Sequence, residues 1–244
     1  MWTKKDIEKH LEVSKRLYKI KDLTFDYLYE GVSEYKVQQF ILKKFKEFDL
    51  IMDRDVPIVA FNENTSHIHY FPKKKSKKLK KNSLVLIDIW ARSKKGGPYA
   101  DITWMGYYRK VPLKVKKVFD LVIKARDNAL TFVRNEVKKG NMPIGCKIDE
   151  VARDVIKEKG YGKNFLHSTG HSLGNYSPHG NRGNLRMTNK KRILNNLGYT
   201  IEPGVYLKGN FGVRSEIDFY ISKGKVFVSG PIQKELVKIK KKKG

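Results

Sequence analysis

The chain has few acidic residues and almost no cysteine. Its 244 residues include 25 Asp and Glu against 52 Lys and Arg, which gives a formal net charge of +27. Because Cys146 is the only cysteine, no disulfide can form within the chain, which favours a reducing, intracellular setting. No apolar run approaches the roughly 18–20 residues of a membrane span. The charged N-terminus, MWTKKDIEKHLEV, is unlike a signal peptide. We therefore expect a cytoplasmic protein with no membrane partner.

The excess of positive charge extends over the whole chain and leaves two interpretations open. Two lysine runs stand out, KKKSKKLKK at 73–81 and VKIKKKKG at 237–244. A surface of this kind would bind a polyanion such as RNA or the ribosome weakly, through electrostatic contact. Alternatively, the runs form a solvated loop and a basic C-terminal tail without any partner.

The hydrophobic pattern predicts an α+β protein. Thr3 and Asp6 resemble a capping box at the start of a first helix, and Ser33 is expected to open a second helix. Apolar residues at helical or alternating spacing predict the remaining elements. We expect helices at 113–138 and 147–159, and strands at 56–61, 83–91, 99–108, 199–206, 214–221 and 225–228.

The order of these elements predicts one domain made of two similar halves. Two helices followed by strands occur twice along the chain, with the halves meeting near residue 113. We place the halves at about 1–112 and 113–236, within a single domain at 1–236. Residues 237–244 are expected to be a basic tail.

Asp88 and Asp101 stand out because acids are scarce and each lies in a strand-like segment, LVLIDIW and YADITW. An ionised carboxylate that is buried without a partner is very costly. A hairpin of the two strands would bring both aspartates alongside each other, where they repel unless a cation lies between them. A salt bridge would be the ordinary explanation for either aspartate alone.

Glu202 and Glu216 repeat this pattern in TIEPG and RSEID, and His171 lies between glycines in GHSLG. Taken singly, each has a plain explanation as a turn residue or a loop histidine. Together, in the order Asp, Asp, His, Glu, Glu, they indicate a metal centre. Four carboxylates and one imidazole suit Mn, Fe, Co or Zn, and they exceed the needs of one ion, so we expect two divalent ions.

At these residues the chain resembles the pita-bread metallopeptidases, which include methionine aminopeptidases, Xaa-Pro aminopeptidases, prolidases and creatinase. LVLIDIW and YADITW look like the two-aspartate hairpin of this family, and FLHSTGHSLG looks like its histidine loop. TIEPGVYLKGNFGVRSEID is similar to the stretch that distinguishes the Xaa-Pro peptidase and prolidase branch. The resemblance runs from GVSEYKVQQFI to about residue 232. It implies a fold in which two pseudo-symmetric halves form a curved antiparallel sheet covered by helices.

The resemblance also assigns roles to the five metal-binding candidates. It implies that Asp88 chelates one ion and that Asp101 and Glu216 bridge both ions. His171 and Glu202 would complete the ligands of the second ion. Glu202 would in addition carry a proton from the attacking water to the leaving amine.

Five further residues receive roles by resemblance or by position near these motifs. His69, in SHIHYFP, and His179 match histidines that steady the substrate near the reacting carbonyl, which makes both catalytic candidates. Candidate substrate-binding residues are His167, which matches a position of the Xaa-Pro branch, and Tyr70 and Arg214, which flank His69 and Glu216.

The implied function is that of a dinuclear-metal aminopeptidase. A hydroxide bridging the two metals would attack the N-terminal peptide bond, and the resemblance to the Xaa-Pro branch implies Xaa-Pro peptides as substrates. His69 and His179 would stabilise the oxyanion. Alternatives are a methionine aminopeptidase-like activity, creatinase-like hydrolysis of a non-peptide C–N bond, and a non-catalytic RNA- or ribosome-binding protein on the same scaffold.

The chain departs from the family pattern in three places. Asp88 and Asp101 are thirteen residues apart and His179 lies eight residues after His171, and both spacings are longer than usual. Gly180 stands where a glutamate often follows the second histidine. The sequence matches only the catalytic domain, whereas Xaa-Pro enzymes usually carry a further N-terminal domain, so peptide length and oligomeric state are left open.

Overall fold

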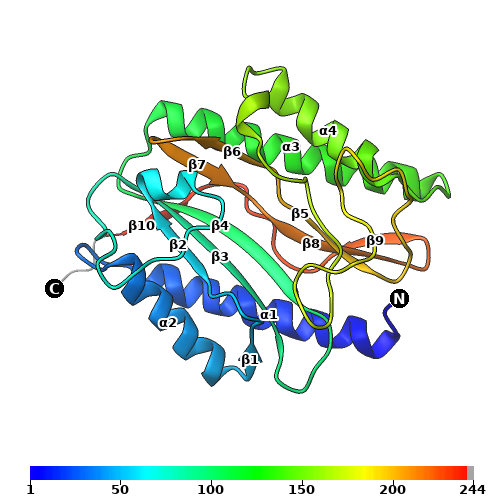
Figure 1. Ribbon diagram of the computed structural model, residues 1–244, viewed down its shortest axis with the longest axis horizontal. Helices are drawn as coiled ribbons and strands as arrows, with labels where there is room; N and C mark the ends of the chain where they lie inside the picture. The colour runs from blue at the N-terminus through cyan, green and yellow to red at the C-terminus, as the bar shows by residue number, and fades with distance from the viewer. Residues whose placement is uncertain (241–244) are drawn as a thin grey trace.

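The computed structural model describes residues 1–240, and its helices and strands agree with an α+β protein (Figure 1). The helices are α1 (Lys4–Tyr27), α2 (Glu34–Glu47), α3 (Leu113–Lys138) and α4 (Gly145–Lys157), with short 3-10 helices η1 (Asn62–Ser66) and η2 (Gly162–Asn164). The strands are β1 (Leu50–Ile51), β2 (Ile58–Phe61), β3 (Ser83–Ser93), β4 (Ala100–Tyr108), β5 (Gly198–Ile201), β6 (Gly204–Leu207), β7 (Phe211–Arg214), β8 (Ile217–Ser222), β9 (Lys225–Val228) and β10 (Val237–Ile239).

Three helices begin where the sequence predicts them, whereas α4 begins and ends two residues earlier than the predicted 147–159. Thr3 and Asp6 form the expected capping box at the start of α1, since each side chain accepts a hydrogen bond from the other residue's backbone N–H. Ser33 caps α2 by accepting from the backbone N–H of Lys36. The predicted bounds of α3 are confirmed. Among residues 1–240, every helix is too short or too polar to cross a bilayer.

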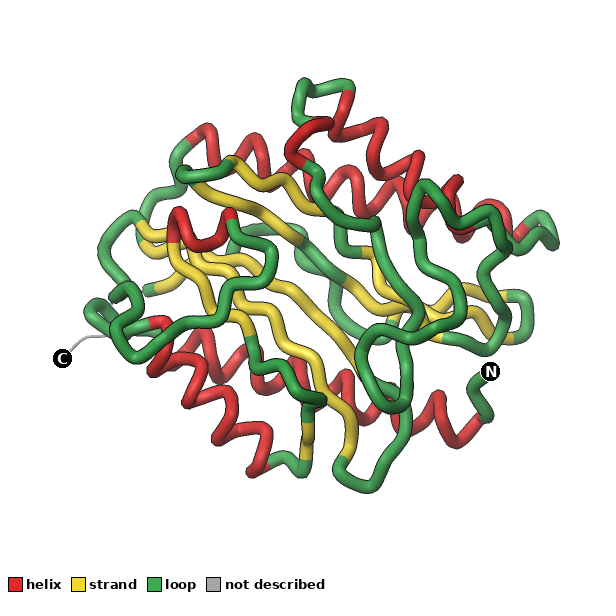
Figure 2. The backbone as a smooth tube through the Cα atoms, in the orientation of Figure 1, coloured by secondary structure: helices red, strands yellow, loops and turns green. Residues whose placement is uncertain are grey.

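The strands lie between two pairs of helices, with α1 and α2 along one side and α3 and α4 along the other (Figure 2). The largest sheet has the order β1-β3-β4-β10, with β2 paired to β3 beside β1. A second sheet has the order β5-β8-β9, and β6 pairs with β7. The predicted hairpin of β3 and β4 is confirmed as an antiparallel pair.

Strand β3 alternates between two hydrophobic cores. Val85, Ile87 and Ile89 pack in the core that contains the buried faces of α1 and α2. Leu84, Leu86 and Trp90 point to the opposite face, into the core shared with α3 and α4. Asp88 follows this second alternation, so its carboxylate faces the space between the two halves rather than the α1 side.

The predicted strands at 199–206 and 214–221 are each interrupted once. The first breaks at Glu202 and Pro203, between β5 and β6, and the second breaks at Ser215 and Glu216, between β7 and β8. Proline supplies no N–H for a strand ladder and restricts the residue before it, which explains the first break. The two glutamates predicted as metal ligands therefore both lie at strand interruptions.

The prediction of a tail at 237–244 is wrong for its first residues. Val237–Ile239 forms β10, which pairs in parallel with β4 at Gly106–Tyr108. Val237 and Ile239 pack against the α1 side core while Lys238 between them is exposed, so the segment alternates as an edge strand does. Residues 241–244 of the predicted tail lie outside the described residues.

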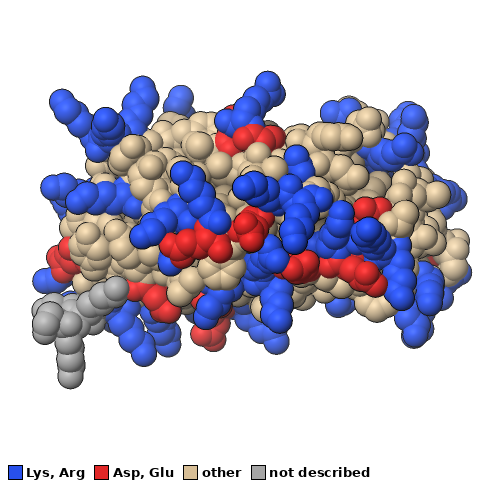
Figure 3. All heavy atoms as spheres, turned by 90° about the horizontal axis from the view of Figure 1, so that it is seen from below, with Lys and Arg blue, Asp and Glu red and all other residues tan. Residues whose placement is uncertain are grey.

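Lys and Arg side chains cover the face shown in Figure 3 along its whole length, with Asp and Glu side chains between them. Nine of the ion pairs in residues 1–240 join residues no more than four positions apart in the sequence, such as Lys116 with Asp120. On this face the positive charge is spread along the molecule instead of being gathered in one patch.

Candidate metal centre

A cavity of about 90 Å³ lies between the β3–β4 hairpin and the interrupted strands of the second half. All five predicted metal ligands line it, together with both predicted catalytic histidines and Arg214. The full lining is Asp53, Asp55, Ile58, His69, Phe71, Asp88, Trp90, Asp101, His171, Pro178, His179, Glu202, Arg214 and Glu216.

The register of the hairpin places the two aspartates diagonally rather than directly opposite each other. Asp88 faces Thr103 and Asp101 faces Trp90 across the strands. Since Asp88 and Trp90 are two residues apart, they share one face of β3, and Asp101 lies on that same face of the sheet. The expectation that the hairpin brings both carboxylates together is confirmed by their place in one cavity.

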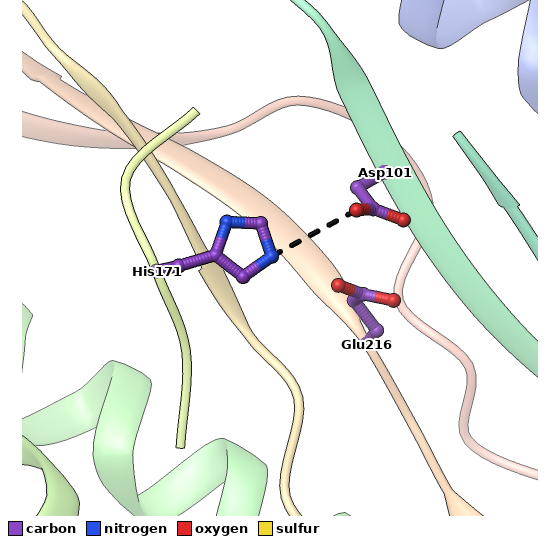
Figure 4. A group of neighbouring side chains, drawn as sticks. All are labelled: Asp101, His171 and Glu216. Atoms are coloured by element: carbon purple, nitrogen blue, oxygen red, sulfur yellow. Dashed lines mark ion pairs between the residues drawn. The ribbon is translucent and has the colours of Figure 1, made fainter. Parts of the chain in front are cut away.

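The side chains of Asp101, His171 and Glu216 form the tightest group of possible metal ligands, called the donor group below (Figure 4). One ligand atom from each of the three lies within 4.8 Å of the others. His171 Nε2 is 3.8 Å from Asp101 Oδ2 and 3.4 Å from Glu202 Oε1. His171 Nδ1 lies 3.1 Å from the carbonyl oxygen of Ser172, which is the contact that leaves Nε2 free to face the carboxylates.

Asp88 is held apart from this group by Arg214. The guanidinium of Arg214 forms a buried ion pair with Asp88 and donates to Thr103 Oγ1 at 3.0 Å and to the hydroxyl of Tyr206 at 3.4 Å. Thr103 in turn donates to Glu216 Oε2 at 2.8 Å. One network thus joins a carboxylate of the hairpin to a carboxylate at the β7–β8 interruption.

Burial of several carboxylates in one cavity raises their pKa values. Burial raises the pKa of Asp101 well above its ordinary value, and the carboxylates of Glu216 and Asp88 raise it further. Burial likewise raises the pKa of Glu216, with Glu202 and Asp88 adding to the effect. For Asp88 burial outweighs the opposing charge of Arg214, so its pKa is also raised.

Burial also shifts the pKa values of the remaining two candidate ligands, Glu202 and His171. Burial raises the pKa of Glu202 to about 7, although Arg214 acts in the opposite direction. Burial lowers the pKa of His171 to about 3, and the neighbouring His179 contributes in the same sense, so the imidazole is neutral and can offer a lone pair.

These five side chains fit a site for divalent cations. The buried carboxylates of Asp88, Asp101 and Glu216 share one cavity with the partly buried Glu202. Apart from histidines, Arg214 is the one basic residue among those that line it. A single guanidinium cannot offset four ionised carboxylates, whereas divalent ions would remove the repulsion that raises their pKa values. Carboxylate oxygens with one neutral imidazole are ligands of the kind that such ions take.

The two predicted catalytic histidines approach the cavity from different loops. His69 lies beyond η1, and His179 follows Pro178 in a loop closed by a bridge between Leu173 and His179. The imidazole rings of His171 and His179 are 4.2 Å apart between centroids. Both histidines therefore stand beside the donor group without belonging to it.

Two predicted substrate-binding residues lie off the cavity wall. His167 Nε2 is 2.7 Å from the hydroxyl of Tyr206, which accepts from Arg214, so His167 reaches the site only through that chain. Tyr70 points the other way and donates its hydroxyl to Glu34 at 2.7 Å. Its neighbour Phe71 lines the cavity instead, because successive side chains of an extended segment face opposite ways.

Sequence reasoning missed several residues around the site. Asp53 and Asp55 line the cavity, and Thr103 joins Arg214 to Glu216. Asp218 is 1% exposed and accepts from the backbone N–H of Asp101 at 2.8 Å. The scarcity of acids that singled out Asp88 would also have drawn attention to Asp218, which lies two residues after Glu216 in the same strand-like run.

Comparison with known proteins agrees with this site. Residues 8–223 match the model of metallopeptidase family M24, so the chain belongs to that family. An uncharacterized peptidase of Staphylococcus aureus strain USA300 is 29% identical over 205 residues, which are 82% of this chain and 54% of the relative. A peptidase of Staphylococcus saprophyticus, also uncharacterized, is 28% identical over 221 residues, which are 89% of this chain and 59% of the relative.

Solved structures share the fold over nearly the whole chain. Prolidase from Thermococcus sibiricus superposes with a TM-score of 0.88 at 28% identity, covering 98% of this chain and 62% of its own. A dipeptidase from Pyrococcus horikoshii gives a TM-score of 0.86 at 26% identity, covering 97% and 63%. The pita-bread fold is thereby confirmed. The chain spans little more than half the length of the curated relatives that it matches.

Proposed function

We propose that the protein is a metal-dependent aminopeptidase that hydrolyses the N-terminal peptide bond of Xaa-Pro peptides. The observation that carries this proposal is the convergence of five donor side chains on one cavity with His69 and His179 beside them. Membership of a metallopeptidase family agrees with it.

Two divalent ions are the number that the donor set supports best. Asp88, Asp101, His171, Glu202 and Glu216 would hold them, and four carboxylates nearly balance the charge of two ions. When bound, such ions supply Lewis acidity, which polarises a carbonyl group and makes water a good nucleophile at neutral pH. Mn, Co, Fe and Zn all suit these ligands.

The chain's own residues handle the proton and the developing charge. Glu202 faces the cavity beside His171 and is placed to take a proton from water and to deliver it to the leaving amine. His69 and His179 can each donate a hydrogen bond to the carbonyl oxygen of the bond that breaks. Ile58, Phe71 and Trp90 give the same cavity apolar walls, which exclude water from around the reacting groups.

The preference for Xaa-Pro peptides has two supports. TIEPGVYLKGNFGVRSEID resembles the Xaa-Pro branch, and its Glu202, Arg214 and Glu216 all line the cavity. The similar solved structures above 25% identity include a prolidase and a dipeptidase.

A peptide panel tests this proposal. We would assay the protein with Mn, Co, Fe and Zn on peptides that begin Xaa-Pro, Xaa-Ala and Met-Ala. The proposal predicts release of the first residue, fastest from Xaa-Pro peptides, and loss of release after treatment with a chelator. A much faster rate on Met-Ala peptides would assign the chain to the methionine aminopeptidase activity. Failure to cleave every peptide with every metal would contradict an aminopeptidase function.

A further inference from the structure

The segment at 52–57, which carries Asp53, Arg54 and Asp55, reaches the more exposed end of the cavity, its mouth, because β1 and β2 pair with the same edge of β3 at separated positions. Ile51 pairs with Arg92 and Ile58 pairs with Asp88. The connection at 52–57 therefore has six residues where β3 has only three, and it must loop away from the sheet. It carries Asp53 and Asp55, both of which line the cavity.

The carboxylate of Asp53 is fixed by donors from both sides of the cavity mouth. Its Oδ1 accepts from the indole Nε1 of Trp90 at 3.2 Å, and its Oδ2 accepts from Ser177 Oγ at 3.1 Å. Trp90 belongs to β3, whereas Ser177 belongs to the loop that carries His179. Asp53 thus stands at a defined place between the hairpin and the histidine loop.

Neither acid at the mouth has a cationic partner within the part of the chain that the structure describes. Asp53 accepts only from neutral groups, and no basic side chain among residues 1–240 lies within ion-pair distance of Asp53 or Asp55. Arg54 stands between the two acids in the sequence, but it is exposed, does not line the cavity and lies in no ion pair with either acid among the described residues. Ions bound at the deeper carboxylates would leave these two charges at the mouth uncompensated.

The walls between the mouth and the metal-binding residues are apolar and aromatic. Ile58, Phe71 and Trp90 line the cavity together with the two acids. Long cationic side chains bury their methylene stems on such surfaces and keep the charged end near polar groups. Aromatic faces also attract ammonium and guanidinium groups. Apolar walls that end in two carboxylates suit a lysine or arginine side chain.

We propose that Asp53 and Asp55 form a specificity subsite that receives the positively charged side chain of a lysine or arginine at the first position of the substrate. This inference rests on the proposed aminopeptidase function, because it assumes that the bond after the first residue is the one that reaches the metal-binding residues.

Depth in the cavity identifies the side chain as the part of the substrate that meets these acids. The ligands Asp88, Asp101, His171 and Glu216 are each no more than 6% exposed, whereas Asp53 is half-buried and Asp55 is exposed. The carbonyl that is cleaved must lie at the deep end, and the α-amine of the same residue is only two bonds further from it. The side chain of the first residue and the peptide after the cleaved bond can both extend towards the mouth. In an Xaa-Pro peptide the second residue is an apolar proline, so the first side chain is the one that can bring a positive charge to these acids.

Arginine and citrulline provide a matched pair of probes, because they have nearly the same shape and differ in charge. We would first measure the binding of free L-arginine and L-citrulline to the metal-loaded protein by calorimetry, which needs no turnover. We would then measure kcat/KM for Arg-Pro against citrulline-Pro and for Arg-Ala against citrulline-Ala. We expect the wild type to favour the charged form in both measurements, by roughly tenfold, and the preference to fall as salt is added.

The variants are Asp53→Asn and Asp55→Asn, with Asp120→Asn as a control. Asp120 is an exposed acid of α3 paired with Lys116, so its replacement removes the same charge away from the cavity. Asp55 accepts no hydrogen bond through its side chain from residues 1–240, so Asp55→Asn changes charge without removing a structural contact. Asp53→Asn alters a carboxylate that accepts three hydrogen bonds, from Trp90, Ser177 and the backbone N–H of Asp55. The preference for arginine should drop severalfold in each cavity variant and stay unchanged in the control.

The outcomes separate this inference from the proposed function. Equal treatment of arginine and citrulline by the wild type, or an equal loss for both probes in the variants, would overturn the subsite. Cleavage of Xaa-Pro peptides without any charge preference would leave the proposed function standing while the inference fails. If the protein binds arginine through Asp53 but cleaves no Xaa-Pro peptide, the binding subsite stands and the proposed Xaa-Pro activity fails.

Discussion

The hydroxyl of Tyr70 donates a 2.7 Å hydrogen bond to Glu34, the first residue of α2, and thereby ties the loop of His69 to a buried helix end. Glu34 is fully buried and also accepts from the backbone N–H of Phe61 and of Lys77 and from the side chain of Asn64. One carboxylate therefore holds both ends and the middle of the segment that presents His69 and Phe71 to the cavity.

Replacing Glu34 with glutamine should weaken this segment. Glutamine keeps the shape but turns one acceptor oxygen into an NH₂ donor that faces other donors, so we expect a loss of about 1–3 kcal/mol in the free energy of unfolding. Because His69 is positioned through Tyr70, kcat should fall as well while metal content is kept. Chemical denaturation, metal analysis and a kinetic assay on one preparation would measure all three.

Two further variants serve as controls for the role of Glu34. Tyr70→Phe removes only one of the hydrogen bonds that Glu34 accepts, and it should lower the free energy of unfolding by about 1 kcal/mol. Glu63→Gln removes a charge from the same region, where Glu63 pairs with Lys77 at the surface, and should change stability by less. Wild-type stability and kcat in Glu34→Gln would show that the carboxylate does not hold the loop.

His69 should be needed for the rate of the reaction and not for metal binding. It lines the cavity but lies outside the group of Asp101, His171 and Glu216. Loss of one preorganised hydrogen-bond donor to a developing oxyanion costs about 10²–10³ in kcat. His69→Ala should show that loss, with metal content and melting temperature near those of the wild type. A fully active variant would end this assignment, and an unfolded one would make His69 a structural residue.

Metal ions should stabilise the protein more at high pH than at low pH. Burial raises the pKa of Glu202 to about 7 from an ordinary value of 4.5. A carboxyl with a raised pKa in the folded state stabilises that state fully below its unfolded pKa, and this contribution is lost as pH rises through its folded pKa. The metal-free protein should therefore lose stability between about pH 4.5 and 7 through this group.

Divalent ions replace those protons, and they bind best where the ligands have lost them. The rise in melting temperature on adding Mn²⁺ should thus be several degrees larger at about pH 8 than at about pH 5.5. Comparing each pH with and without metal cancels the titration of other groups. In Glu202→Gln the difference between the two pH values should shrink. An equal rise at both pH values in the wild type would argue against ligands with raised pKa values.

The sequence was sufficient for the features that depend on local pattern. The amphipathic period of α3 defined both of its ends, and the alternation in β3 and β4 identified the hairpin that carries Asp88 and Asp101. The strand breaks at Glu202 and Glu216 were missed. Pro203 marks the first of them in the sequence, whereas the second, at Ser215 and Glu216, has no proline or glycine and is defined by a change of pairing partner from β6 to β5.

Contacts between residues far apart in the chain were beyond such reasoning. Arg214 and Asp88 are 126 residues apart, and nothing local to either predicts their ion pair. The side of the loop to which Tyr70 points depends on Glu34, which is 36 residues away. For the same reason a role for the half-buried Asp53 and the exposed Asp55 can be proposed only once the fold places them at the cavity.

The central claim is a two-metal aminopeptidase, and a titration of metal-free protein with Mn²⁺ tests it most directly. The rate of release of the first residue from an Xaa-Pro peptide would be measured against the equivalents of metal bound. We predict that the rate rises to a plateau at two ions per chain, and that Asp101→Ala and Glu216→Ala abolish it because both side chains lie in the donor group. Full activity with one bound ion, or no activity at any ratio for several metals, would contradict the account.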